Sequence, residues 1–88
     1  MGWKVRFEKR AEKDLRRLGH TAQVRILQFI RDRLVETDNP REVGESLHGP
    51  LGKYWKYRVG EYRLIAALED DIVTISIIRV GHRGDVYR

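Results

Sequence analysis

A two-residue turn, Gly60-Glu61, most constrains the fold of this chain, because it separates two runs of residues with β-strand character. Residues 53–59 are rich in aromatic side chains, and residues 62–69 are mainly apolar. A loop of two residues that begins with glycine is typical of a type II′ β-hairpin. We therefore expect these two runs to form an antiparallel hairpin whose register is fixed by the turn.

In that register Val59 pairs with Tyr62, and Arg58 pairs with Arg63. Because side chains alternate between the two faces of a strand, one face collects the apolar residues of both runs, namely Trp55, Tyr57, Val59, Tyr62, Leu64, Ala66 and Leu68. The other face collects Lys56, Arg58 and Arg63. Two directly opposed arginines destabilise a hairpin, and a sequence selected only for stability would pair opposite charges there. Their presence therefore favours a functional role, namely a cationic patch that binds phosphate. The alternative is a solvated sheet face with splayed arginines, and a register slip of one residue would remove the pairing.

The N-terminal half has the periodicity of one strand and two helices. Trp3, Val5 and Phe7 alternate with charged residues, as in a half-buried strand. Residues 8–18 have helical spacing, and Gly19 provides a stop. We expect Thr21 to cap a second helix that ends before Asn39-Pro40, with a buried stripe formed by Val24, Leu27, Ile30 and Leu34.

The remaining segments complete an α+β fold. A short helical piece is expected near residues 42–47, a loop at 48–52, and a last strand at 72–80 after the Asp70-Asp71 turn. The predicted fold is one domain, residues 1–88, in which two antiparallel helices pack on an antiparallel sheet in the order β-α-α-β-β-β. The sequence has no cysteine, shows no signal-peptide pattern at residues 1–4 and contains no membrane-spanning run, so we expect a cytoplasmic protein with no membrane partner.

Charge is distributed unevenly along the chain, whose formal net charge is +5. Residues 1–41 contain 11 Lys/Arg and 6 Asp/Glu, whereas residues 42–88 contain 7 of each. Such an excess favours binding to a polyanion such as nucleic acid or an acidic protein, although it also serves simple solubility. The cations of the first helix that we expect to face solvent are Lys9, Arg10, Lys13, Arg16 and Arg17.

A second candidate site lies at residues 79–88, after the last predicted strand. Histidine is the only kind of side chain whose ordinary pKa lies near neutrality, so His82 is a candidate general acid or base, although a lone loop histidine is commonly just solvated. Arg83 can bind a phosphate oxygen, and Tyr87 can stack on a base or simply pack. The sequence offers no metal-ligand spacing among its three histidines and no glycine-rich phosphate loop, so we expect neither a metal nor a cofactor.

Taken together these segments resemble the RelE/ParE toxin superfamily, and specifically its RelE type. The resemblance covers nearly the whole chain, including the opening strand and basic helix at 7–15. Its motifs are LHG at 47–49, WKYR at 55–58, EYRLI at 61–65, VGHR at 80–83 and DVYR at 85–88.

The resemblance implies a toxin of a type II toxin–antitoxin system that cleaves messenger RNA in the ribosomal A site. Cleavage in that family uses the 2′-hydroxyl of the RNA as nucleophile and needs no metal. The family's functional residues correspond to Lys56, Arg58, Arg63, Arg83 and Tyr87. Arg58 and His82 stand where the best-known member has lysine, which leaves the general acid and base unassigned among Lys56, His82 and the arginines.

The resemblance also implies partners. These are the ribosome and messenger RNA, an acidic RelB-like antitoxin, and DNA only through the toxin–antitoxin complex. The first-helix cations would then hold ribosomal RNA backbone, or merely form a solubilising face with pairs such as Glu12–Arg16. A ParE-like toxin that shares the fold, lacks nuclease activity and inhibits DNA gyrase is the alternative function.

Overall fold

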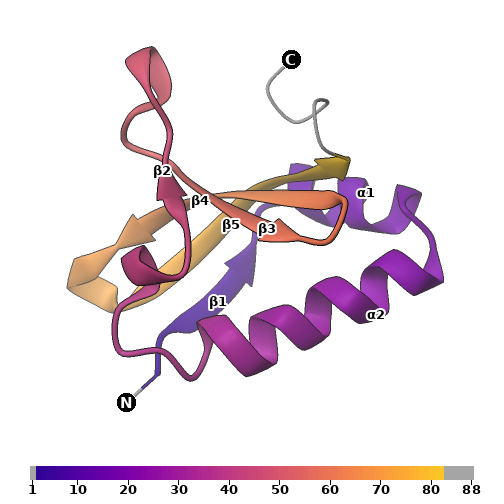
Figure 1. Ribbon diagram of the computed structural model, residues 1–88, viewed down its shortest axis with the longest axis horizontal. Helices are drawn as coiled ribbons and strands as arrows, with labels where there is room; N and C mark the ends of the chain where they lie inside the picture. Colours follow the sequence, from indigo (N-terminus) through magenta and orange to yellow (C-terminus); the bar gives the residue numbers. More distant parts are fainter. Residues whose placement is uncertain (1, 83–88) are drawn as a thin grey trace.

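The order of elements follows the sequence prediction in the computed structural model, which describes residues 2–82 (Figure 1). Strand β1 is followed by two helices and then by four further strands. A π-helical turn, Ile30–Leu34, continues the second helix, and 3-10 turns occur at Pro40–Glu42, Gly49–Leu51 and Asp70–Ile72. The strands and helices are β1 (Lys4–Phe7), α1 (Lys9–Arg17), α2 (His20–Phe29), β2 (Glu45–Ser46), β3 (Trp55–Val59), β4 (Tyr62–Glu69) and β5 (Thr74–His82).

The strands form one sheet in the order β1-β5-β4-β3-β2. Three neighbouring pairs are antiparallel, but β1 runs parallel to β5, so the expectation of a wholly antiparallel sheet is corrected at this pair. The parallel pair places the first and last strands of the described chain next to each other in the sheet. The two-residue strand β2, which was not expected, adds a fifth strand at the other edge.

The predicted hairpin register is confirmed. Val59 pairs with Tyr62, and Arg58 pairs with Arg63. Gly60 has a φ of 60°, whereas Glu61 is not among the residues with positive φ, as a type II′ turn requires. The apolar face of this hairpin packs under the helices, as expected, with Tyr57 and Leu64 fully buried against Ile26 and other core residues.

The second helix buries Ile30 and Leu34, as predicted, but not the first half of the predicted stripe. Its buried residues are Ala22, Ile26, Ile30 and Leu34, which recur at intervals of four. Val24 and Leu27 are instead 39% and 49% exposed. The small Ala22 allows the helix to approach the core closely, a property that hydrophobicity alone does not reveal. Thr21 is also not the cap, since α2 begins at His20 after Gly19, whose φ is 89°.

The helical piece expected at residues 42–47 is largely wrong. The side chain of Asn39 accepts a hydrogen bond from the Arg41 backbone N–H and starts a 3-10 turn that ends at Glu42. The chain then runs as β2 beside β3. Gly44 permits this close approach, because a Cβ at this position would lie 2.5 Å from the carbonyl oxygen of Lys56.

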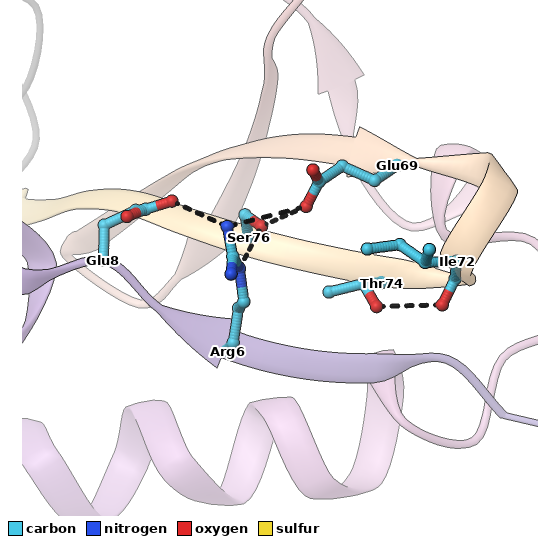
Figure 2. A network of polar contacts seen from close by, with 6 residues as sticks. All are labelled: Arg6, Glu8, Glu69, Ile72, Thr74 and Ser76. Atoms are coloured by element: carbon cyan, nitrogen blue, oxygen red, sulfur yellow. Dashed lines mark hydrogen bonds and ion pairs between the residues drawn. The ribbon is translucent and has the colours of Figure 1, made fainter.

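On the sheet face turned away from the helices, a polar network joins the edge strand β1 to its neighbours β5 and β4 (Figure 2). The guanidinium of Arg6 donates to the Ser76 hydroxyl over 2.8 Å, and that hydroxyl donates to Glu69 over 2.6 Å. Arg6 also pairs with Glu8 at 3.2 Å. The network therefore fixes β1 against β5 and β4 from the side opposite the core.

Between residues 2 and 82, no helix combines the length and the apolar character needed to cross a membrane.

Candidate functional site

Two of the predicted site cations, Lys56 and Arg58, lie together on β3 around a carboxylate. Strand β2 pairs Glu45 with Lys56. Glu45 Oε2 lies 3.6 Å from Lys56 Nζ, and Glu45 Oε1 lies 3.8 Å from the Arg58 guanidinium. The Lys56 side chain is only 18% exposed, whereas Arg58 and Glu45 are 62% and 61% exposed. The site is therefore a mixed-charge cluster at the edge of the sheet, with its lysine largely enclosed.

Glu45 was not predicted from the sequence as a site residue. Its carboxylate adds a negative charge between the two cations Lys56 and Arg58. Only the register between β2 and β3 brings the carboxylate here. The one sequence signal that marks this place is Gly44, the residue directly before Glu45, which allows the close approach of the two strands.

Arg63 lies on the same sheet face as Arg58, as predicted, but its guanidinium is already engaged. One terminal nitrogen donates to the carbonyl oxygens of Gly60 and Tyr62 at 3.0 and 2.9 Å. The residue is only 9% exposed. The two carbonyl oxygens therefore offset the positive charge of Arg63, which lowers the cost of opposing two arginines in this hairpin.

His82 lies on the other face of the sheet from Lys56 and Arg58. It pairs with Tyr62 across β4 and β5, and the two ring centroids are 4.9 Å apart. Tyr62 belongs to the helix-covered face, so the histidine does too, although it remains exposed at the strand end. The structure therefore divides the predicted set between two faces at the hairpin end of the sheet. The predicted site residues Arg83 and Tyr87 lie outside the described residues.

The segment that carries Glu45 is held by a clamp between Arg41 and Asp70. The Arg41 guanidinium donates two hydrogen bonds to the Asp70 carboxylate, at 3.0 and 2.8 Å, and lies 5.9 Å from the Trp55 ring centroid. The hydrogen bond from Arg41 lowers the pKa of Asp70, and the same bond raises the pKa of Arg41. The clamp ties the entry to β2 to the β4–β5 turn.

A buried tyrosine holds the same segment from the core side. The Tyr57 hydroxyl donates to the Pro40 carbonyl oxygen over 3.0 Å. Burial raises the pKa of Tyr57 to about 12, and the Arg41 charge opposes that rise. Tyr57 therefore acts as a neutral hydrogen-bond donor under ordinary conditions.

All five predicted cations of α1 are exposed, as expected from its buried side. That side contains Ala11, Asp14 and the partly buried Leu15 and Leu18. Arg10 lies 3.8 Å from Asp14, so one cation is partly compensated. Within residues 2–82, no three His, Cys, Asp or Glu side chains gather closely enough to hold a metal ion.

The cluster on β2 and β3 offers two cations, Lys56 and Arg58, that can bind a phosphate, and one carboxylate, Glu45, that can accept a proton.

Comparisons with known proteins identify relatives along the whole chain. The family described as the ParE toxin of the type II toxin–antitoxin system parDE matches residues 5–87. Toxin RelG of Mycobacterium tuberculosis is 34% identical over 88 residues, which cover 100% of this chain and 99% of RelG. The mRNA interferase toxin RelE of Escherichia coli is 33% identical over 91 residues, covering 99% of this chain and 92% of RelE.

Solved structures agree with these sequence matches. A chain of the toxin–antitoxin complex RelBE2 from Mycobacterium tuberculosis superposes with a TM-score of 0.86 at 31% identity, covering 94% of this chain and 100% of that one. A chain of the archaeal RelE–RelB complex from Pyrococcus horikoshii gives a TM-score of 0.71 at 29% identity, covering 98% and 100%. The two-helix, five-stranded architecture is thus shared with proteins crystallised as toxin–antitoxin complexes.

Proposed function

Because this chain belongs to the RelE/ParE superfamily of type II toxin–antitoxin toxins, we propose that it is an endoribonuclease that cuts messenger RNA on the ribosome. The observation that carries the proposal is the cluster in which Lys56 and Arg58 flank the carboxylate of Glu45. Two cations around a proton acceptor are what a phosphodiester needs when its own 2′-hydroxyl attacks it. The reaction requires no metal ion in this scheme.

The chemical step transfers two protons. A base removes the 2′-hydroxyl proton as O2′ bonds to phosphorus, and the P–O5′ bond breaks as an acid protonates O5′. The products are a 2′,3′-cyclic phosphate and a 5′-hydroxyl. Lys56 and Arg58 stabilise the negative charge that grows on the phosphate. The ribosome contributes by holding the messenger in an attack-ready geometry.

Glu45 is the base that this geometry favours. Arginine stays protonated, which removes Arg58 from the role, and Glu45 pairs with both cations that would hold the phosphate. Lys56 remains the alternative base. His82, the titratable side chain of the C-terminal set, supplies the proton to O5′. Arg83 stabilises the negative charge on the phosphate, and Tyr87 stacks on the adjacent base.

The second candidate function is that of a ParE-like inhibitor of DNA gyrase. Its support is the family match itself, which carries the ParE name over residues 5–87. Both functions include neutralisation by an antitoxin, because relatives occur in RelB complexes. An acidic antitoxin segment that folds on binding suits the basic surface here, and DNA binding would come through that complex.

The deciding experiment incubates purified protein with translating ribosomes and separately with gyrase and relaxed plasmid. We expect messenger to be cut on ribosomes, free RNA to survive and supercoiling to proceed. Uncut messenger together with blocked supercoiling would assign the gyrase function instead.

Single substitutions then test the roles. We expect Lys56→Ala, Glu45→Gln and Arg83→Ala each to lower the cleavage rate by about 10²–10³, as for the loss of one transition-state contact. Lys53→Ala is the matched control, because Lys53 is an exposed cation just before β3. Its ammonium lies over the Tyr54 ring rather than beside Glu45. Wild-type rates for Glu45→Gln would return the base role to Lys56.

His82 is tested by the shape of the pH–rate profile. If the imidazole is the general acid or base, His82→Ala should remove one limb of the profile. An unchanged shape with a small loss would mean that His82 acts only as a cation.

A further inference from the structure

The edge strand β1 covers only the first part of β5. Their pairing runs from Lys4 with Thr74 to Phe7 with Ile77, and the Glu8 N–H then donates to the Ile77 carbonyl oxygen over 2.9 Å. Strand β5 continues to His82 without β1. Along that stretch the neighbour is α1, as Figure 1 shows.

A bulge in β5 lies at the place where β1 ends. Ala66 pairs with Ile77, but the preceding residue Ile65 pairs with Arg79, so Ile78 is the extra residue. Bulges bend a strand and redirect the residues that follow. The last residues of β5 therefore need an anchor of their own at the exposed edge.

A buried carboxylate on α1 provides that anchor. One oxygen of Asp14, Oδ2, accepts a hydrogen bond from the Val80 backbone N–H and another from Arg79 Nε, both at 3.0 Å. The Asp14 side chain is 7% exposed. Its other oxygen lies 3.8 Å from Arg10, one of the cations expected to hold RNA. At Val80 the carboxylate of Asp14, rather than a neighbouring strand, thus accepts the backbone N–H.

We propose that Asp14 is a positioning residue for the cleavage reaction, acting by fixing the end of β5 that carries His82. This inference rests on the proposed nuclease function. Beyond Val80, Gly81 pairs with Arg63 and His82 pairs with Tyr62. Without Asp14 the Val80 N–H loses its partner and the strand end is free to shift away from α1.

Two substitutions of Asp14 distinguish a positioning role from a general effect on the stability of the protein. Asp14→Ala removes both hydrogen bonds. Asp14→Asn keeps an oxygen that can accept from Val80 while removing the charge that attracts Arg79 and Arg10. Glu12→Ala is the matched control, because Glu12 lies on the same helix and is exposed.

The test measures amide hydrogen exchange, ribosome affinity and the single-turnover cleavage rate of each variant. For Asp14→Ala we expect about tenfold faster exchange at residues 80–82 and about tenfold slower cleavage, with the exchange of β3 amides unchanged and the ribosome Kd not raised. Asp14→Asn should recover most of both losses. Glu12→Ala should match wild type.

Three outcomes would overturn the proposal. They are wild-type cleavage by Asp14→Ala, slower cleavage without faster exchange at residues 80–82, and equally faster exchange throughout the core. If Asp14→Ala does not fold, Asp14→Asn decides, since the proposal requires it to retain protection at Val80 and cleavage together. A wild-type protein that fails to cut messenger would instead refute the proposed function.

Discussion

Glu45 shows why the candidate site could be predicted from the sequence only in part. The alternation of residues 55–59 and 62–68 placed Lys56, Arg58 and Arg63 on one face, because a two-residue turn leaves little freedom of register. The carboxylate enters through a strand of two residues, which is too short to have a periodicity. Its place depends on a close approach at Gly44 that becomes visible only in three dimensions.

At Val73 the backbone has a strained conformation that a single substitution should relieve. Its φ and ψ are both 49°, and a β-branched residue disfavours this left-handed region. We expect Val73→Asn to raise the free energy of unfolding by about 0.5–1 kcal/mol, since left-handed backbone costs most L-residues about 1–2 kcal/mol and asparagine much less. Urea unfolding measures the change.

The neighbouring Ile72 supplies the control for that prediction. It is exposed and has no positive φ, so Ile72→Asn should not stabilise the protein. Equal gains from both variants would show that reduced surface hydrophobicity, rather than backbone strain, is responsible.

Among the elements, the hairpin was predictable and the face of α2 was not. The apolar pattern of residues 22–34 fits two stripes that share Ile30 and Leu34. Hydrophobicity favours the stripe through Val24 and Leu27, whereas close packing selects the one through Ala22 and Ile26. Alanine is weakly hydrophobic but small, so only the packed structure decides.

The clamp between the β2 segment and the β4–β5 turn should make stability depend on acidic pH. The pKa of Asp70 is lower in the folded protein than its ordinary value of 3.8, because Arg41 donates to the carboxylate. Its contribution is therefore present above pH 3.8 and lost as the pH falls through the lowered value. We expect Asp70→Asn to reduce this acid dependence in urea unfolding at several pH values. Asp71→Asn, which changes a neighbouring exposed carboxylate, should leave it unchanged.

Tyr57 should give the same segment an alkaline limit. Its pKa rises from 10.0 to about 12 on folding, so its contribution is complete below pH 10 and is lost as the pH approaches 12. Tyr57→Phe should flatten that alkaline loss. At pH 7 it should cost about 1–3 kcal/mol, because the Pro40 carbonyl loses a buried donor. A variant as stable as wild type at pH 7 would contradict this account.

For the whole molecule, the order of elements could be predicted but the parallel β1–β5 pair could not. That pair joins residues about 70 positions apart, and no local pattern specifies which strand an opening strand will join. The excess of cations in residues 1–41 follows directly from the sequence, and the structure confirms that the cations of α1 are exposed.

The exposed apolar residues of α2 should take part in antitoxin binding. Val24 and Leu27 lie one turn apart, with Arg31 a further turn along, so an acidic amphipathic segment fits this face. We expect Val24→Lys with Leu27→Lys to weaken binding of the antitoxin peptide by at least about tenfold, since burying each side chain is worth about 1.5–3 kcal/mol. Isothermal titration measures the affinity, and messenger cleavage should stay at the wild-type rate. Unchanged affinity would place the antitoxin on another face.

The basic face of α1 should dominate the electrostatic part of ribosome binding. Reversing Lys9, Lys13 and Arg17 to glutamate should raise the ribosome Kd and flatten its dependence on salt, because fewer counterions are released when fewer cations meet RNA phosphates. Reversing Arg25, Arg31 and Arg33, which are equally exposed but lie on α2 and its continuation, changes the net charge by the same amount. If binding depends on net charge alone, both triple variants will have the same salt slope, and α1 is then only a solubilising surface. If α1 is the docking element, only the variant with reversed charges on α1 will lose salt dependence. The antitoxin binding and circular dichroism of that α1 variant should remain those of the wild type.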